Sequence, residues 1–364
     1  MQIDMHYYGT YAMAASAGIP CKEAQIIAHA AQYVDDQDHE QFKAVRVVGG
    51  DTCEAVYGIA TAHSPMDLNA DAGLIHTLIK RIQRKPISDT KDDSRMVWVP
   101  FHFLPGGGNA SYLERIICKT DSRIANEMIS HHISLAGETF GLQLMGIAAH
   151  VYADTFSHFG FAGAESELNK VDINSINLDN RHSAQAIEKI WNLTEHIKTR
   201  IAGESTLGHG AVDTLPDTPF LKWEFTNASG EVDSRDNHAL FLSACRRLHE
   251  HFTEFARAKG YGSASVKFDE IEPAVSTILR FEGDAEERTV RWMEAMGKGE
   301  LGNHVQPCGH YDPMMWSDHL KAALDSRNAT AIVNSDAYLF YAAADYHRHF
   351  VLKRLLPQHQ VIVA

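Results

Sequence analysis

Two histidines and an aspartate recur at four-residue spacing within one apolar stretch of the sequence. Residues 146–158 read GIAAHVYADTFSH, which places His150, Asp154 and His158 at positions i, i+4 and i+8. Residues four apart on a helix are neighbours, so we expect these three side chains on one face of a buried helix. Burying such polar groups without partners costs free energy. A divalent metal ion is a partner that satisfies all three together.

The composition supports the same chemistry. Histidine is unusually frequent, at 22 of 364 residues, and the 47 acidic residues outnumber the 33 basic ones. Imidazole and carboxylate groups are typical zinc ligands. Six further candidate ligands lie elsewhere in the chain: His6, Asp35, Asp36, His102, His209 and Asp213.

Two of these candidates are alternatives, because the segment AAQYVDD ends with adjacent carboxylates. His29 lies seven residues before Asp36, so a continuing helix would place those two on one face, which favours Asp36 over Asp35. His29 itself fits a packed core histidine better than a ligand. His209 and Asp213 repeat the i, i+4 spacing of the first pair.

The elements that must position these residues are predominantly helical. Hydrophobic periodicity and start signals predict helices at 5–17, 22–34, 66–84, 109–132, 138–158, 183–202, 237–259, 268–280, 284–297, 315–326 and 334–354. Three stretches are predicted to contain strands: 44–60, with a Gly-Gly-Asp turn, 96–103 and 220–232. We expect a mainly α protein with small β-hairpin additions. Residues 1–233 would form the metal-binding part, and residues 234–364 a helical extension packed on it. Alternatively, the two parts would form a single domain.

Composition also excludes several classes of protein. No apolar run approaches the ~18 residues of a membrane span, and the N-terminus lacks a secretory pattern, so we expect a cytoplasmic protein. The five cysteines are widely spaced, which argues against a disulfide framework or a thiolate zinc site. The net charge of −14 disfavours binding to duplex nucleic acid. GxSxG and HExxH motifs, a P-loop and a His-Asp dipeptide are all absent.

The order of the candidate ligands resembles the zinc-dependent phospholipase C and single-strand nuclease superfamily. Its pattern is an N-terminal histidine, an aspartate closing a helix, a loop histidine, HxxxD with a further histidine, and a histidine with an acidic residue four positions on. The corresponding residues here are His6, Asp35 or Asp36, His102, His150 with Asp154 and His158, and His209 with Asp213. The aromatic-x-Asp spacing of that family favours Asp35. The resemblance implies a multi-helix bundle that holds two or three zinc ions.

The resemblance also implies roles for these residues. Asp154 would bridge two ions, with Asp35, His102 and His150 completing one coordination sphere. His158, His209 and Asp213 would hold a second ion, and His6 a third. Asp35 would also accept a proton from the attacking water, so Asp35 and Asp154 are the expected catalytic residues.

One departure from the family concerns the N-terminus. Family members use a processed N-terminal tryptophan, whose amino group and carbonyl bind one zinc ion. Met1 is not expected to reproduce this, and Gln2 disfavours removal of Met1. The third ion then needs a substitute ligand, for which Asp4 is the candidate.

The predicted function is a zinc-dependent phosphodiester hydrolase of phospholipase C type. Its substrate would be a phosphodiester-containing small molecule or lipid, and other divalent metals use the same donors. The alternative is a non-catalytic metal-binding or scaffold protein built on the same helices. The acidic balance and the missing N-terminal tryptophan motivate that alternative.

Overall fold

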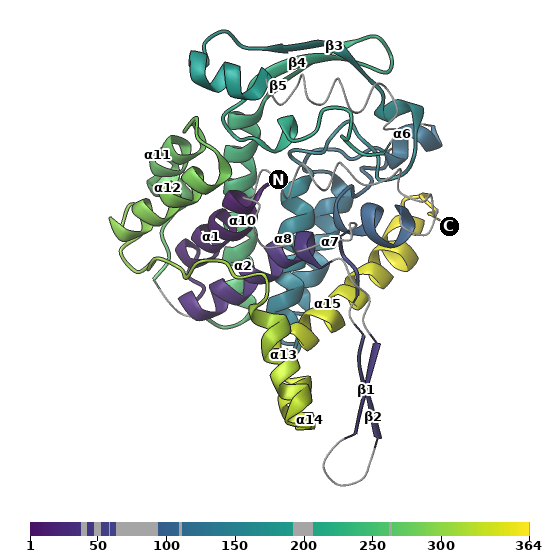
Figure 1. Cartoon of the computed structure of the whole chain (residues 1–364), viewed down its shortest axis with the longest axis vertical. Coiled ribbons are helices and arrows are strands. Elements are labelled where there is room, and N and C mark those ends of the chain that lie inside the picture. Colours follow the sequence, from purple (N-terminus) through teal and green to yellow (C-terminus); the bar gives the residue numbers. More distant parts are fainter. Residues whose placement is uncertain are drawn as a thin grey trace.

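The computed structural model describes residues 1–37, 42–46, 52–57, 59–62, 94–108, 111–191, 207–261 and 264–363. Most of these residues are helical, which confirms a mainly α protein (Figure 1). The longer helices are α1 (Thr10–Ser16), α2 (Cys21–Asp36), α7 (Arg123–Ser134), α8 (Gly141–Asp154), α10 (Asn237–Ala258), α11 (Phe268–Leu279), α12 (Ala285–Gly297), α13 (Met315–Asp325) and α15 (Asp336–Phe350). The short helices are α5 (Val99–Phe101), α6 (Tyr112–Ile116), α14 (Ala329–Val333) and α16 (Leu356–Gln358).

Tighter and wider helical turns complete the helical part. Wide π turns form η1 (Asp4–Gly9), η2 (Ser94–Trp98) and η5 (Val351–Leu355). The 3-10 turns are η3 (Glu167–Asn169) and η4 (Leu215–Asp217). The π turn η1 leads directly into α1, and such turns are frequent at functional sites.

The strands form two small antiparallel sheets. The predicted hairpin at 44–60 is present as β1 (Phe42–Arg46) paired with β2 (Thr52–Tyr57). The second sheet has the order β3-β4-β5, with β3 (Val171–Leu178), β4 (Lys222–Asn227) and β5 (Val232–Asp236). Its register pairs Leu178 with Trp223 and Lys222 with Asp236. The prediction at 220–232 therefore captured β4, whereas β3 was not predicted.

Several predicted boundaries were wrong. Residues 96–103 were predicted as a strand but lie in η2, α5 and the turn after them, because Pro100 occupies the first turn of a helix, a position where proline is favoured. The predicted helix at 109–132 is broken into α6 and α7 by a new cap, in which the Ser122 hydroxyl accepts from the Ala125 amide. The predicted helix at 66–84 and residues 192–202 of the helix at 183–202 lie outside the described residues.

The central helix is α8, which is buried along almost its whole length. It packs against α2 at close range, and Gly146 makes this possible. A Cβ at Gly146 would lie 2.3 Å from the Ile27 carbonyl oxygen and 2.5 Å from the Ala30 Cβ. Small residues on both helices thus bring the C-terminal ends of α2 and α8 together.

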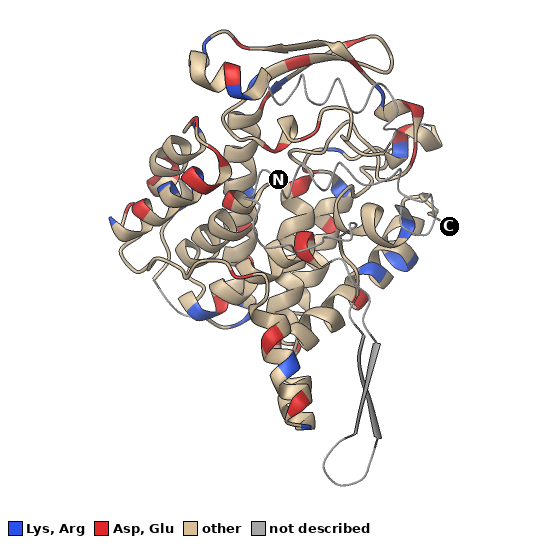
Figure 2. Ribbon diagram, in the orientation of Figure 1, with Lys and Arg blue, Asp and Glu red and all other residues tan. Residues whose placement is uncertain are grey.

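One apolar core draws on both halves of the chain. Its buried residues run from Met1 to Ala162 and again from Phe241 to Val361, and a smaller cluster lies under the three-stranded sheet. Figure 2 shows charged residues of both signs on the outer helices, whereas α1 and most of α8 carry none. No helix among the described residues is long and apolar enough to cross a membrane.

Candidate metal centre

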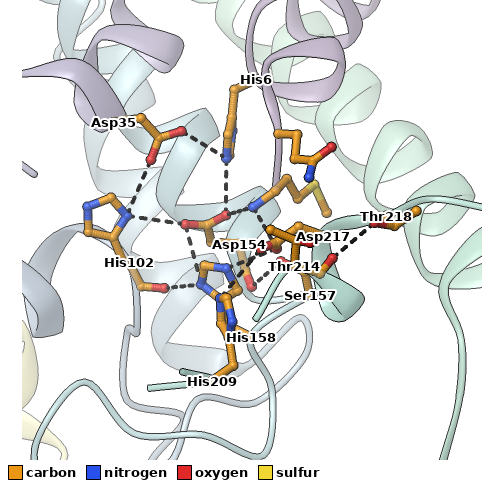
Figure 3. Close-up of polar contacts among 12 residues, drawn as sticks. His6, Asp35, His102, Asp154, Ser157, His158, His209, Thr214, Asp217 and Thr218 are labelled. Atoms are coloured by element: carbon orange, nitrogen blue, oxygen red, sulfur yellow. Dashed lines mark hydrogen bonds and ion pairs between the residues drawn. The ribbon is translucent and has the colours of Figure 1, made fainter. Parts of the chain in front are cut away.

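Three groups of histidine and aspartate side chains converge beside the C-terminal end of α8. Within each group the donor atoms lie within 4.8 Å of one another. The first group contains His6, His150 and Asp154, the second Asp35, His102 and His150, and the third His158, His209 and Asp217. Figure 3 shows most of these side chains pointing toward Asp154 and Asp217. Seven of the predicted ligands therefore meet at one place.

Two helix ends supply the central carboxylates. Asp35 lies in the last turn of α2, and Asp154 is the last residue of α8. The C-terminal end of a helix carries partial negative charge, so carboxylates there are unfavourable without a cation nearby. Neither helix has a basic residue in its last turn. A bound cation would compensate both the carboxylates and the helix ends.

Four of the five histidines in these groups are held by backbone carbonyl oxygens. The contacts are His150 Nδ1 to Ala31 O at 2.8 Å, His102 Nε2 to Thr61 O at 2.8 Å, His158 Nδ1 to His102 O at 2.8 Å and His209 Nδ1 to Asp213 O at 2.7 Å. A carbonyl oxygen only accepts, so the ring nitrogen facing it must carry the proton. In each neutral ring the other nitrogen then presents a lone pair. This arrangement is typical of metal-ligating histidines.

These lone pairs face one another and the carboxylates. His150 Nε2 lies 3.3 Å from His102 Nδ1, and these two atoms lie 3.2 and 3.6 Å from Asp154 Oδ2. Both nitrogens also lie 3.9 Å from Asp35 Oδ1. Such contacts between acceptors repel unless a proton or a cation lies among them. Two ligands on a tetrahedral zinc ion lie about 3.3 Å apart, which matches this spacing.

The third group repeats the arrangement around Asp217. His158 Nε2 lies 3.3 Å from Asp217 Oδ1, and His209 Nε2 lies 3.5 Å from Asp217 Oδ2. The helix predicted at 138–158 is shorter than expected, since α8 ends at Asp154, but the following turn still brings His158 beside Asp154 at 3.5 Å.

The acidic partner of His209 in the structure is Asp217, and the predicted ligand Asp213 lies outside the three groups. The i, i+4 spacing presumed a helix, but Asp213 has a φ of 48°, which breaks helical geometry. Its backbone carbonyl, rather than its side chain, contacts His209. Asp217 closes the same segment GHGAVDTLPD, where η4 returns it to the cluster. The sequence feature that could have indicated Asp217 is its position directly after Pro216, which favours a turn.

The choice between the adjacent carboxylates at the end of α2 falls on Asp35. Asp36 accepts a hydrogen bond from the Tyr311 hydroxyl at 2.7 Å and is outside all three groups. His29, on the face of Asp36, is buried against Trp316 and Tyr311, with ring centroids 4.1 and 4.8 Å away. It is a core histidine, as expected.

The N-terminal segment contacts the cluster through its first residue. The α-amino group of Met1, the first residue of the printed sequence, lies 2.8 Å from Asp154 Oδ1 and 3.0 Å from Asp217 Oδ1. It thus forms ion pairs with two carboxylates of the cluster. Asp4, the predicted substitute ligand, instead forms an ion pair with Arg288 at 2.6 Å.

The electrostatics reflect a surplus of negative charge. Burial favours the neutral carboxyl, but His158, the Met1 amine and His150 outweigh it and hold the pKa of Asp154 well below its usual range. Burial likewise disfavours a charged imidazole, yet Asp154 and Asp35 raise the pKa of His150. For the Met1 amine the same carboxylates and Asp217 overcome burial and raise its pKa to about 11. The cluster attracts positive charge.

Three further pKa shifts have burial as their first cause. Burial and the neighbouring His150 lower the pKa of His6 to about 4, and burial lowers that of His209 to about 4 as well. Burial and the nearby Asp217 raise the pKa of the Asp213 carboxyl to about 7. Neutral His6 and His209 rings are the form that binds a metal ion.

Residues not predicted from the sequence hold the ligands in place. The buried Arg235 of β5 donates to the carbonyl oxygens of Ser157 at 3.0 Å and Phe159 at 2.6 Å, on either side of His158. Phe103 stacks on the His158 ring at 4.7 Å. Gly208 makes room for Phe103, since a Cβ there would lie 2.5 Å from its ring.

The donor set fits zinc or a similar divalent ion. It consists of imidazole nitrogens and carboxylate oxygens, with three side chains in each group. Three protein ligands with one open position are typical of catalytic zinc, whereas four thiolates or histidines close a structural site. The four backbone-held histidines, whose other ring nitrogens face carboxylates, are the feature of this cluster that best fits a metal ion.

Comparison with known proteins yields one family. No curated protein and no solved structure matches the chain. A family of unknown function, DUF6765, matches residues 1–355, which include every residue of the candidate centre. The chain therefore belongs to the DUF6765 family.

Proposed function

We propose that this protein is a zinc-dependent phosphodiester hydrolase of phospholipase C type, with its catalytic centre at the three His/Asp groups. The observation that carries the proposal is the set of backbone-held histidines. His102, His150, His158 and His209 each direct a lone pair at a carboxylate. The order of ligands along the chain, which resembles the zinc-dependent phospholipase C and nuclease superfamily, supports the choice of reaction.

Each group would hold one ion. Asp35, His102 and His150 would bind one ion, His158, His209 and Asp217 a second, and His6 would serve a third. Asp154 lies between these groups, with Oδ2 toward His150 and Oδ1 toward His6, so it would bridge ions. Zinc bound here would acidify water and stabilise the negative charge that develops on phosphoryl oxygens.

A protein side chain would accept the proton that the attacking water loses. Asp35 has 18% of its side chain exposed, whereas Asp154 has 1%, so of these two carboxylates Asp35 is the one that water and substrate would reach. Asp35 would accept the proton of the attacking water. His209 is also 18% exposed, so the reacting phosphate would approach from the side of Asp35 and His209. A small phosphodiester or a lipid headgroup offers the required phosphorus.

The first test counts metals and measures turnover in the Asp154→Asn variant. Elemental analysis of the unmodified protein should find two or three zinc ions per chain, and hydrolysis of bis(4-nitrophenyl) phosphate should disappear on chelation and return with zinc. Asp154→Asn should lose at least one ion and lower kcat/KM by about 100-fold or more, beyond the 10–100-fold typical of outer-shell changes. The matched control is Asp36→Asn, on the neighbouring residue that Tyr311 holds outside the centre.

Two results would contradict the proposal at different points. Full zinc content in Asp154→Asn would exclude the bridging role. If the unmodified protein has its full zinc content but hydrolyses no phosphodiester, the result would instead favour the alternative function, a metal-binding protein that does not catalyse hydrolysis.

A further inference from the structure

A buried ion pair connects the N-terminal segment to the C-terminal half of the chain. Arg288, on α12, donates from Nε to Asp4 Oδ2 at 2.6 Å and from Nη2 to Asp4 Oδ1 at 3.2 Å. Asp4 is 1% and Arg288 2% exposed. The two contacts form a bidentate fork, the strongest geometry for an arginine and a carboxylate.

The remaining donors of Arg288 fix its orientation. Nη1 donates to the Gly283 carbonyl oxygen at 2.7 Å, just ahead of α12, and Nη2 also donates to Gln2 Oε1. Arg288 is therefore anchored to the turn ahead of its own helix while it holds two residues of the N-terminal segment. Burying the Asp4–Arg288 pair costs the desolvation of two charges, so a gain in folding stability does not by itself explain why the pair is there.

The segment that Arg288 holds carries His6. Asp4 begins η1 and His6 lies on the same turn, where its ring stacks on His150 with centroids 3.8 Å apart. His6 Nε2 lies 3.2 Å from Asp154 Oδ1. Its Nδ1 is buried and has no hydrogen-bond partner among the described residues. Unlike the other four histidines of the centre, His6 is not held by a backbone carbonyl.

We propose that Arg288 is a positioning residue of the metal centre, which acts through Asp4 to place His6 beside Asp154. On this proposal the C-terminal half of the chain controls metal binding in the group formed by His6, His150 and Asp154. The inference rests on the metal centre proposed above and adds the residue that regulates the occupancy of one group. It also assigns a role to α12, which supplies no ligand itself.

The test compares Arg288→Met with Arg291→Met in the full-length protein. Arg291 lies one turn further along α12 and is 44% exposed, so it is a matched control. Zinc is titrated against a chromophoric chelator, and hydrogen exchange of residues 1–9 is measured in the metal-free protein. Arg288→Met should weaken the binding of one ion roughly tenfold or more, as outer-shell changes do, and leave the other ions in place. Exchange at residues 1–9 should accelerate while α8 stays protected.

Two conservative variants complete the design. Arg288→Lys keeps the charge but loses the fork, so it should recover part of the lost affinity. Asp4→Asn keeps the shape of the side chain and should reproduce the defect even if Arg288→Met does not fold. His6→Ala should remove the same single ion.

The outcomes separate this inference from the proposed function. Unchanged zinc affinity in both Arg288→Met and Asp4→Asn, with His6→Ala defective, would overturn the positioning role alone. Parallel loss of all ions and of α8 protection would also overturn it, because the pair would then be merely structural. If His6→Ala binds zinc like the unmodified protein, His6 is not a zinc ligand and the proposed group of His6, His150 and Asp154 is wrong. Unchanged hydrogen exchange at residues 1–9 in Arg288→Met would show that Arg288 does not hold the N-terminal segment, and would overturn the positioning role.

Discussion

At the scale of single residues, a backbone carbonyl determines which ring nitrogen of His209 faces Asp217. Asp213 adopts a φ of 48°, and this conformation turns its carbonyl oxygen toward His209 Nδ1 at 2.7 Å. The proton is thereby fixed on Nδ1, and Nε2 is left to face Asp217. Asp213 contributes through its backbone and Asp217 through its carboxylate.

Replacing the carboxylate should therefore matter at Asp217 but not at Asp213, where only the backbone conformation is needed. Asn tolerates positive φ, so Asp213→Asn should keep the full zinc content, whereas Asp213→Val should lower the free energy of unfolding by about 1–3 kcal/mol and weaken the third group. Asp217→Asn should lose the ion of that group with the fold intact. Elemental analysis and thermal unfolding measure both effects. A zinc deficit in Asp213→Asn beside a normal Asp217→Asn would restore Asp213 as the ligand.

At the scale of elements, the centre depends on how closely α2 and α8 approach. Each helix carries a candidate ligand carboxylate in its last turn, Asp35 on α2 and Asp154 on α8, and the close contact at Gly146 sets how near the two helices lie. Gly146 has no side chain and Ala30 only a methyl group, so the two helix backbones can lie close together here. The candidate metal centre thus lies at helix ends whose separation depends on packing.

Gly146→Ala should disturb both packing and metal binding. The added Cβ would meet the Ile27 carbonyl oxygen at 2.3 Å, so the helices must separate, at a cost of about 1–3 kcal/mol for an overpacked core. The expected result is a lower unfolding temperature without metal and weaker zinc binding. Gly137→Ala is the control, because nothing lies within 4 Å of a Cβ there. Equal behaviour of the two variants would show that this crossing does not set the centre.

At the scale of the whole molecule, buried neutral histidines outside the centre make the fold sensitive to acid. Burial lowers the pKa of His29 to about 3, and that of His251 and His347 to about 4. Above pH 6.5 these rings are neutral in both the folded and the unfolded chain. Below that pH the unfolded chain takes up protons that the folded chain does not, so stability falls as the pH decreases from 6.5 toward 4.

This linkage predicts the size of the effect. Each histidine should remove about 2 kcal/mol of stability between pH 7 and pH 5, since one pKa unit corresponds to about 1.4 kcal/mol. Urea unfolding of the metal-free protein at the two pH values measures the sum. His29→Leu should reduce the pH dependence by one proton, whereas His349→Gln, at an exposed position, should leave it unchanged. A flat profile would mean that these rings are protonated in the folded protein.

Much of the fold could be predicted from local pattern. The apolar periodicity of residues such as 237–258 and 285–297 reflects the burial of one helix face, so these helices were predicted within two residues. The break between α6 and α7 and the strand β3 were missed. A cap at Ser122 and the edge pairing of β3 with β4 depend on contacts that periodicity does not contain.

The sequence by itself determined which residue types the candidate centre contains. Residue types and the spacing of His150, Asp154 and His158 were enough to indicate a buried metal centre, because polar groups on an apolar helix require a partner. Only the tertiary structure decided which residues complete it. Asp217 rather than Asp213, Asp35 rather than Asp36, and the ion pair of Asp4 with Arg288 follow from backbone conformation and long-range packing. Spacing along the chain predicts neighbours only within one helix, and most of this centre lies between elements.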